Sequence, residues 1–434
     1  MHKLIKELFL AFFIICAKQI LAQSTQNSNI VYIKAGKLFD SENAILLNNF
    51  IIKVEGNRIT EVAKNIVIPN ESNLIDLSDY TILPGLIDGH THLLSSESPK
   101  EKHSTTNELL YTGDALRVLR AGKKANSFLK NGITTVRDLG NSGKFLDVAL
   151  KKAIKEGTID GPRMIVSGPI ISSEGGQFRG LVKKHEHLIS DEYRIVRSVD
   201  DAINSVRENI TYGADIIKIC ANNSPNNTTL TLDEMKAIVK TAHRYNTKVT
   251  AHGTDDRAIW EAVSAGVDGI EHGWNVSDST LIYMASNNVA LIPTFSSYEE
   301  SIKWLELIKY EGDLEKEAKS WVKGGKDLIK QAKKAGVTIV AGSDNYYDYG
   351  IPQGLAVKQI FIAYHQAGMK PLDILQSSTF LSAKFMDKAD KLGVIKKGAY
   401  ADIIAVKGDL INDFSSSMFN VIFVMKDGKI YVEP

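Results

Sequence analysis

The segment Pro84-Gly-Leu-Ile-Asp-Gly-His-Thr-His92 joins an apolar strand pattern to two histidines. Alternate residues of a strand point to the same face, so His90 and His92 project together, and Asp88 shares their face. Two imidazoles at the carboxyl end of a strand can bind one divalent ion, and imidazole suits zinc. A single His-x-His pair also arises by chance, so the prediction of a metal site needs support from the rest of the chain.

The region around this segment repeats an apolar strand followed by an amphipathic helix, which is typical of parallel β/α units. Helical patterns cover Ala202–Tyr212, Thr231–Tyr245, Asp255–Ala265 and, as the longest, Ser301–Ala335. The candidate strands are Leu86–His92, Thr134–Leu139, Arg163–Ile170, Asp215–Ala221, Lys248–His252, Gly269–His272, Ala290–Thr294 and Thr338–Asp344. Eight strands are the number that a closed barrel needs, so we predict an α/β fold with a (β/α)8 TIM barrel over residues 84–390.

The two flanks of the predicted barrel contain short alternating strands separated by turn signals. Ile30-Val-Tyr-Ile33 and Phe50-Ile-Ile-Lys-Val54 lie before the barrel, and Asp402-Ile-Ile-Ala-Val406 and Ile430-Tyr-Val432 lie after it. Neither flank has enough strands for a stable sheet with a covered face. We therefore expect residues 23–83 and 391–434 to pair into one small β-sandwich domain.

The first 22 residues have the pattern of a secretory signal peptide. A basic start, Met1-His-Lys-Leu-Ile-Lys6, precedes an apolar run from Leu8 to Ala17 and a small-residue site at Ile20-Leu-Ala22. The run is shorter than the roughly 20 residues of a membrane-spanning helix, so a retained anchor is the weaker alternative. We expect an exported protein, periplasmic or secreted, that has no membrane segment after cleavage.

The composition is that of an ordinary globular protein, with 434 residues, 44% hydrophobic and 24% charged. The formal charge is +1, and a chain without the three lysines and one glutamate of the leader would carry −1. This near-neutrality gives no electrostatic reason to expect a nucleic-acid partner. Of the two cysteines, Cys16 lies in the leader, so a cleaved chain keeps only Cys220 and forms no internal disulfide.

Four more candidate ligands lie on the other predicted strands. His252 and His272 each end a strand and precede a glycine, and Asp344 closes the last strand. Lys218 lies inside Asp215-Ile-Ile-Lys-Ile-Cys220, where an unpaired ammonium is costly to bury. A deprotonated lysine there can react with carbon dioxide to form a carbamate that bridges two cations. The alternative is a lysine that reaches solvent or pairs with a carboxylate.

On these residues the chain resembles the amidohydrolase superfamily, in the branch of Xaa-Pro dipeptidases, Xaa-Arg/Lys carboxypeptidases and imidazolonepropionase-like enzymes. The likeness covers nearly everything after the leader. Besides the ligands it rests on Gly132-Ile-Thr-Thr-Val-Arg-Asp-Leu-Gly140, Gly161-Pro-Arg-Met164, Ala265-Gly-Val-Asp-Gly-Ile-Glu-His-Gly273, Pro293-Thr294 and Gly398-Ala-Tyr-Ala-Asp-Ile403.

The resemblance implies a site with two divalent metal ions, expected to be Zn²⁺. It implies that His90 and His92 hold the buried ion, that Lys218 bridges as N6-carboxylysine, and that His252 and His272 hold the exposed ion. Asp344 would complete the site. A metal-bridging hydroxide would be the nucleophile. Asp344 would accept its proton and deliver it to the leaving amine as general base and acid.

Two loops depart from the pattern of these relatives. Relatives in the dipeptidase branch commonly carry Gly-Gly-His where this chain has Gly175-Gly-Gln177, and Asn222–Thr229 replaces a Thr-Gly-Gly stretch. We expect Arg137 and Arg179 to hold a substrate carboxylate, because guanidinium matches it in two-point contact, unless each is a structural ion pair. Gln177 and Tyr298 are further candidate substrate contacts.

The sequence favours a metal-dependent hydrolase of amide bonds that acts on a small molecule, such as a dipeptide or an N-acyl amino acid. One alternative is a cyclic amide, imidazolone or ester as substrate. Another is a non-catalytic binding protein, which the complete ligand set argues against. The chain can also form a homo-oligomer, but the sequence does not fix its state.

Overall fold

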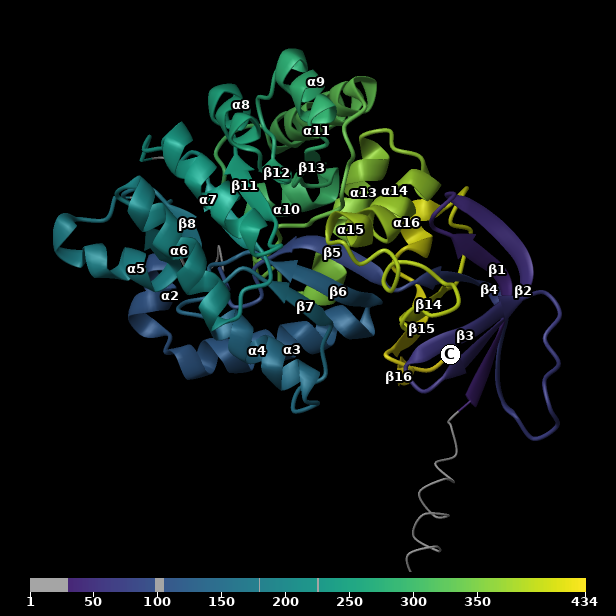
Figure 1. Cartoon of the computed structure of the whole chain (residues 1–434). Coiled ribbons are helices and arrows are strands. Elements are labelled where there is room, and N and C mark those ends of the chain that lie inside the picture. Colours follow the sequence, from purple (N-terminus) through teal and green to yellow (C-terminus); the bar gives the residue numbers. More distant parts are fainter. Residues whose placement is uncertain (1–29, 98–104, 179, 225) are drawn as a thin grey trace, which may run out of the picture.

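The computed structural model describes residues 30–97, 105–178, 180–224 and 226–434. A sheet built from both flanks of the chain lies on one side, and a larger part with parallel strands and surrounding helices forms the rest (Figure 1). The predicted signal peptide, residues 1–22, lies outside the described residues. The predicted α/β class with parallel strands is confirmed.

The flank sheet has seven strands in the order β16-β15-β14-β4-β1-β2-β3. Strand β14 pairs antiparallel with β4, with Ile403 opposite Pro84, so the C-terminal flank continues the sheet of the N-terminal flank. The strands are β1 (Ile30–Asp40), β2 (Ile45–Glu55), β3 (Arg58–Ala63), β4 (Asn73–Pro84), β14 (Ile403–Val406), β15 (Val421–Lys426) and β16 (Lys429–Val432).

This sheet curls around its own apolar core. The backbone N–H of Ala401, just before β14, donates to the carbonyl of Asn57 at the start of β3, and Gly428 donates to Ala401. Buried side chains of both flanks, including Ile59 and Phe423, share one core cluster. The two flanks thus pair in one seven-stranded sheet, and the sandwich form of this domain stays a prediction.

The larger part holds the predicted β/α units. Neighbouring strands pair in parallel within two groups, β5-β6-β7 and β13-β12-β11-β10-β8-β9. Their bounds are β5 (Leu86–Thr91), β6 (Ile133–Asp138), β7 (Arg163–Val166), β8 (Ile170–Ser172), β9 (Tyr193–Ile195), β10 (Ile217–Cys220), β11 (Val249–Gly253), β12 (Gly269–His272) and β13 (Ala290–Ile292).

Backbone hydrogen bonds also join these two groups at both ends. The N–H of Asp215, ahead of β10, donates to Val166 of β7 at 2.7 Å. On the other side Val340 donates to Leu291 of β13 at 2.9 Å, and Gly89 of β5 donates to Ala341 at 2.8 Å. The eight predicted strand segments are thus hydrogen-bonded to one another in a closed order.

Two predicted strands differ from the structure. Arg163–Ile170 is divided into β7 and β8, so that its first part pairs with β6 and its second with β10. Thr338–Asp344 makes an isolated bridge, Leu291 to Ile339, and backbone bonds to β5, but it is not a regular strand. Its last residue, Asp344, has a φ of 51°, which takes the backbone out of the extended region.

The helices lie outside the strands of the larger part (Figure 1), and many of them contribute buried apolar side chains to the main core cluster. Their bounds are α2 (Thr105–Tyr111), α3 (Asp114–Lys130), α4 (Leu146–Lys155), α5 (Ile189–Glu192), α6 (Val199–Tyr212), α7 (Leu232–Arg244), α8 (Asp256–Ala265), α9 (Asp278–Ser286), α10 (Tyr298–Leu307), α11 (Leu314–Ala335), α12 (Gln353–Ala356), α13 (Gln359–Gln366), α14 (Pro371–Ser377), α15 (Phe380–Phe385) and α16 (Phe414–Ser417). A short 3₁₀-helix covers Lys183–Leu188.

The long helical segment predicted at Ser301–Ala335 forms two helices, α10 and α11. The chain turns at Lys309, which has a φ of 54°. Asp313 then starts α11 by accepting a hydrogen bond from the N–H of Lys316. The apolar periodicity continues on both sides of the turn, which is why the sequence pattern alone does not reveal it.

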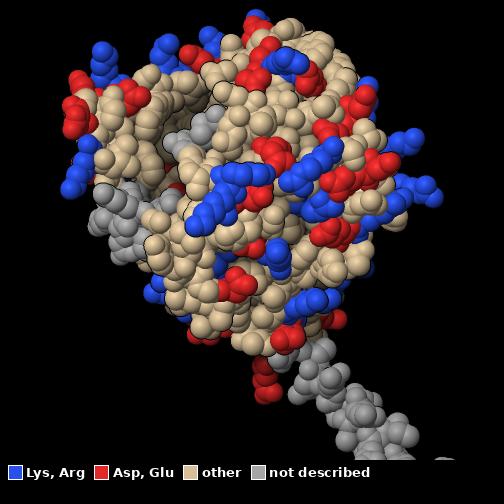
Figure 2. Space-filling model, turned by 90° about the vertical axis from the view of Figure 1, so that its left-hand side faces the viewer, with Lys and Arg blue, Asp and Glu red and all other residues tan. Residues whose placement is uncertain are grey.

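The surface carries both signs of charge. On the face shown in Figure 2, Lys and Arg are interspersed with Asp and Glu, and a hollow with mostly uncharged walls opens at the upper left. Within the described residues, none of the helices has the length and apolar character needed to span a bilayer.

Candidate metal centre

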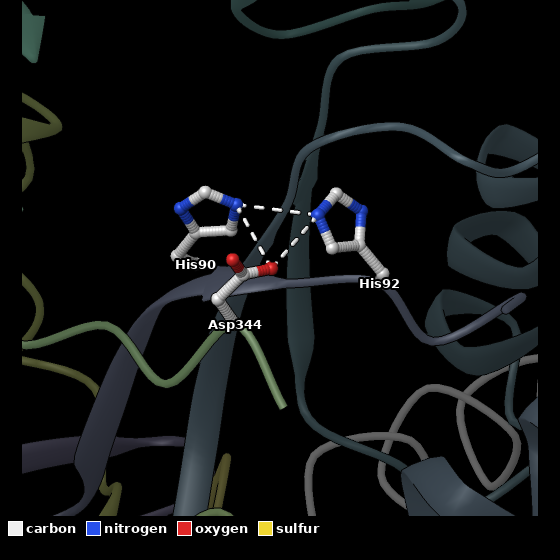
Figure 3. Close-up of side chains that lie close together, drawn as sticks. All are labelled: His90, His92 and Asp344. Carbon is white, nitrogen blue, oxygen red and sulfur yellow. Dashed lines mark hydrogen bonds and ion pairs between the residues drawn. The ribbon is translucent and has the colours of Figure 1, made fainter. Parts of the chain in front are cut away.

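Three predicted ligands from two segments form a tight cluster. His90 and His92 come from the end of β5, and Asp344 ends the segment that is hydrogen-bonded beside it (Figure 3). One ligand atom of each lies within 4.8 Å of the others. The Nε2 atoms of His90 and His92 are 3.2 Å apart, and the Asp344 Oδ1 atom lies 3.5 and 3.2 Å from them.

Strands β11 and β12 bring two more predicted ligands to the same place. The ring of His272 lies 5.1 Å from that of His90 and 4.5 Å from that of His252, between centroids. The Nδ1 atom of His272 is 3.6 Å from Oδ2 of Asp344. Parallel strands end at a common edge, so histidines separated by up to 182 positions meet there.

Lys218 extends from β10 into this group and is 2% exposed. Burial lowers the pKa of Lys218 below its usual range, because the charged ammonium loses its hydration. Its charge acts on His90, His252 and Asp344, so the side chain faces the cluster. A lowered pKa favours the neutral amine that carbamate formation requires.

Three histidines of the cluster are held as neutral bases, whereas at His92 the contact with Asp344 outweighs burial and raises the pKa. Burial lowers the pKa of His90 to about 4 and that of His252 to about 3, and it lowers the pKa of His272 well below its usual range. Neutral imidazole is the form that binds metal. Burial acts to raise the pKa of Asp344, but His90 and His92 outweigh it and keep this carboxyl ionised. Neutral imidazoles around a carboxylate fit divalent transition metals.

Three of the rings are oriented by a hydrogen bond at the second nitrogen. The Nδ1 atom of His90 is 2.7 Å from Oε2 of Glu271, and that of His92 is 2.7 Å from the Gly140 carbonyl. Because these oxygens accept, each Nδ1 carries the hydrogen and each Nε2 keeps its lone pair for the site. The Nδ1 atom of His272 lies 2.6 Å from the hydroxyl of Thr294.

Glu271 is a part of the site that the sequence prediction missed. It is fully buried in β12, and its Oε1 atom lies 2.6 Å from Nη2 of Arg137 and also accepts from the Thr250 hydroxyl. Burial acts to raise the pKa of Glu271, but Arg137 and His90 hold it well below its usual range. The sequence did offer a signal for Glu271, namely a carboxylate within an apolar strand, because such a buried group needs a charged partner.

Arg137 lies in the interior, not against open space. It is 0% exposed, and besides the Glu271 contact its Nε donates to the carbonyl of Gly89 at 2.5 Å. This geometry supports the alternative of a structural ion pair over the expected contact with a substrate carboxylate. The guanidinium is committed to holding the carboxylate that orients His90.

Asp88 joins β5 to the segment that ends in Asp344. Its Oδ1 accepts from the N–H of Ser343 at 2.9 Å, and its Oδ2 accepts from the Ser343 hydroxyl at 2.6 Å. Burial raises the pKa of Asp88 to about 6. These bonds fix Asp344 relative to the two histidines of β5.

Two of the predicted ligands have a left-handed backbone. The φ angles of His272 and Asp344 are 70° and 51°, in a region that favours glycine. Such conformations cost energy and cluster where the side chain must point in one direction. Here they turn the last residue of each segment toward the cluster.

The other predicted substrate contacts, Gln177, Tyr298 and Arg179, differ in their position relative to the cluster. The Nε2 atom of Gln177 lies 2.9 Å from Nε2 of His252, so this side chain borders the cluster. Tyr298 begins α10, where its N–H donates to Gln366, and it is not among the residues that line the cavity beside Asp344. Arg179 lies outside the described residues.

A cavity of about 680 Å³ opens next to Asp344. Ser343, Asp344 and Thr294 form its floor, and residues of α10, α11 and the segment after Asp344 form its walls. The sequence analysis did not identify these wall residues, because they come from separate elements with no common motif.

Comparison with known proteins assigns the same superfamily as the sequence motifs. The sequence model of the Amidohydrolase family matches residues 81–431. Ochratoxinase from Aspergillus niger is 26% identical over 454 aligned residues, covering 96% of this chain and 90% of that protein. Imidazolonepropionase from Fusobacterium nucleatum is 24% identical, with 83% of this chain and 85% of that protein covered.

Solved structures give the same result. A Xaa-Pro dipeptidase with bound methionine in its active site superimposes with a TM-score of 0.81 and 29% identity, over 93% of this chain and 100% of the other. A prolidase complexed with N-methylphosphonate-L-proline gives 0.81 and 27% over the same shares. The structure of the Aspergillus niger ochratoxinase gives 0.76 and 25%, over 93% and 96%.

Proposed function

Because this chain belongs to the amidohydrolase family and is a hydrolase that acts on amide bonds, we propose that it is metal-dependent and cleaves dipeptides or N-acyl amino acids. The observation that carries the proposal is the convergence of His90, His92 and Asp344 within 4.8 Å, with His272 and His252 beside them. The amide-cleaving relatives favour this substrate class over a cyclic amide or an ester.

We assign the cation ligands as His90, His92, Lys218, His252, His272 and Asp344, with two divalent cations, expected to be Zn²⁺, and Lys218 as N6-carboxylysine. The low pKa of buried Lys218 supports the modification. The closed order of hydrogen bonds among eight segments supports a (β/α)8 barrel over residues 84–390, and the shared flank sheet supports a second domain of residues 23–83 and 391–434.

Each side chain then has a defined task. When bound, the cations supply an activated water and polarise the scissile carbonyl. Asp344, held by the Asp88–Ser343 bonds, accepts the proton of that water and passes it to the leaving amine. Glu271 keeps the lone pair of His90 directed at the site.

The test measures metal content and hydrolysis together. We expect stoichiometric transition metal in the purified protein and release of free amino acids from a panel of Xaa-Pro, Xaa-Arg and N-acyl amino acid substrates. Asp344→Asn should lower kcat by at least about a hundredfold, because it removes a proton-transferring group. Asp191→Asn, an exposed matched control, should not.

A protein without bound metal, in which Asp344→Asn hydrolyses the panel as well as the wild type, would show that the proposal is wrong. Hydrolysis restricted to imidazolones or esters would support the alternative substrate class. We also propose export through residues 1–22, which sequencing the amino terminus of the secreted or periplasmic protein would check.

A further inference from the structure

The cavity beside Asp344 has walls made largely of aromatic rings. Its volume of about 680 Å³ lies within the range of small-molecule sites. The rings belong to four stretches of the chain: the turn after β12, the loop after β13, the helical hairpin α10–α11 and the segment after Asp344. The residues are Trp274, Phe295, Trp304, Trp321, Tyr346, Tyr347 and Tyr349.

Four of these rings are connected by ring contacts to the histidines of the cluster. Tyr346 lies edge-on to His92 at 5.6 Å and stacks on Tyr347 at 4.5 Å, and Tyr347 contacts Trp304 at 4.3 Å between centroids. On the other side, the ring of Trp274 is 5.3 Å from that of His272. A flat aromatic group in the cavity would contact the faces and edges of these rings.

The side chains that line the cavity do not suit the carboxylate end of the proposed substrate. Three of the described lining residues carry a carboxyl group, namely Glu300, Asp327 and Asp344. None of the described lining residues is Lys or Arg. A substrate carboxylate would therefore find no basic side chain among the described residues of this cavity. The carboxylate end of a dipeptide or N-acyl amino acid must lie outside the cavity, which leaves the acyl end for it.

Glu300 gives the inner wall little negative charge. Its Oε1 atom accepts a hydrogen bond from the Asn345 amide at 2.5 Å, and burial raises the pKa of Glu300 to about 7. The uncharged form is therefore well populated at neutral pH. Such a wall suits an uncharged aromatic group better than a cation.

We propose that this cavity receives an uncharged aromatic acyl group, so that the preferred substrates are N-aroyl amino acids. The inference rests on the proposed function, since it assigns the acyl side of the same scissile amide. It differs from that proposal in being testable by binding as well as by turnover.

The first experiment compares kcat/KM for N-(2-naphthoyl)-L-alanine, N-acetyl-L-alanine and L-lysyl-L-alanine. The three share the leaving amino acid and differ in the acyl group. We expect the naphthoyl substrate to exceed the acetyl one by at least about tenfold, since it buries a full aromatic surface. An equal kcat/KM, or a larger one for the lysyl substrate, overturns the proposal.

A substitution that fills the cavity tests the proposal without disturbing the fold. Gly324 lies on the cavity side of α11, and a Cβ added there meets nothing within 4 Å. Gly324→Leu also improves helix propensity. We expect the naphthoyl-to-acetyl ratio to fall at least about fivefold, because the new side chain occupies the space of the ring. Gly113→Leu, where a Cβ is equally unhindered but outside the cavity, should leave the ratio unchanged.

Removing a wall ring should act in the same direction. Trp304→Ala is expected to lower the ratio by roughly tenfold, because its stacking surface is lost. Trp260→Ala is the matched control, since Trp260 stacks on Tyr283 outside the cavity. An unchanged ratio in both Gly324→Leu and Trp304→Ala overturns the proposal.

Binding of 2-naphthamide, measured by isothermal titration calorimetry with acetamide as reference, separates this inference from the proposed function. We expect 2-naphthamide to bind the wild type and to bind Gly324→Leu at least about tenfold more weakly. If the protein binds 2-naphthamide in this way but hydrolyses no amide, the proposed substrate class fails and the aromatic subsite stands. If 2-naphthamide does not bind, the inference is wrong.

Discussion

At the scale of single residues, the site depends on side chains that touch no substrate. Glu271 orients His90 and is itself held by Arg137, so two fully buried charges determine where the Nε2 lone pair of this predicted ligand points. Buried pairs of this kind are costly to break, because the remaining charge stays unpaired in a low-dielectric interior. The cluster is therefore sensitive to changes just behind it.

The substitution Glu271→Gln tests this arrangement. Glutamine keeps the shape but loses the charge that Arg137 and His90 share, so we expect metal affinity to fall by roughly 10- to 100-fold. Competition with a chromogenic chelator measures the affinity, and circular dichroism reports whether the fold persists. Glu261→Gln, which changes a partly exposed carboxylate paired with Arg257, is the control. Equal metal affinities of Glu271→Gln and the wild type would contradict the assigned role.

At the scale of elements, helices α12 and α13 are tied to the C-terminal flank by one buried lysine. Lys358 is 0% exposed, and its Nζ donates to the carbonyl of Met418, just after α16, at 2.9 Å. Burial lowers the pKa of Lys358 to about 7. The contact that joins these elements is therefore sensitive to pH.

The sign of this dependence follows from linkage. Since the folded-state pKa of Lys358 lies below the ordinary value of 10.5, the unfolded chain binds one proton more between these values. The stability that the neutral Lys358 side chain allows is fully present above the unfolded pKa of 10.5. It is lost progressively as the pH falls from there through about 7. We expect Lys358→Met to flatten the pH dependence of the unfolding free energy by up to about 1.4 kcal/mol per pH unit in the mildly alkaline range.

Urea unfolding of wild type and Lys358→Met at several pH values measures this difference. The exposed substitution Lys334→Met on α11 is the control, and it should leave the slope as in the wild type. Parallel curves for Lys358→Met and the wild type would show that the ammonium is not excluded from the interior.

At the scale of the whole molecule, the flank sheet and the larger part share one core. The main apolar cluster contains Leu83 from the N-terminal flank and Val406, Phe414 and Val424 from the C-terminal flank, along with the side chains behind the strands of the larger part. Closely packed interiors of this kind transmit a loss of packing to their neighbours. The two parts should therefore unfold together.

We expect a single unfolding transition in which far-ultraviolet circular dichroism and tryptophan fluorescence coincide. Phe414→Ala should shift both signals together by about 3 kcal/mol or more, because it leaves a cavity in the shared core. Ile411→Ala, at an exposed position nearby, should shift neither. Two separate transitions, with only one of them moved by Phe414→Ala, would contradict a common core.

The amino-acid sequence alone indicates which polar residues stand where the apolar segments end. Alternation along Leu86–His92 places His90 and His92 on one face. Local sequence was also enough to show that His252, His272 and Asp344 close apolar segments. The metal-ligand roles of these residues stay predictions, but their meeting at one edge follows from parallel strands, whose carboxyl ends point the same way.

Only the tertiary structure decided what lies behind and beside these residues. Arg137 and Glu271 meet across 134 positions, so no local pattern distinguished this ion pair from a substrate contact. The turn between α10 and α11 is invisible in the apolar periodicity, yet it brings Trp304 and Trp321 to the wall of the same cavity, where Trp304 contacts Tyr347. Strand and helix patterns record which face of an element is buried, whereas a cavity depends on how separate elements pack, and that is fixed by the whole fold.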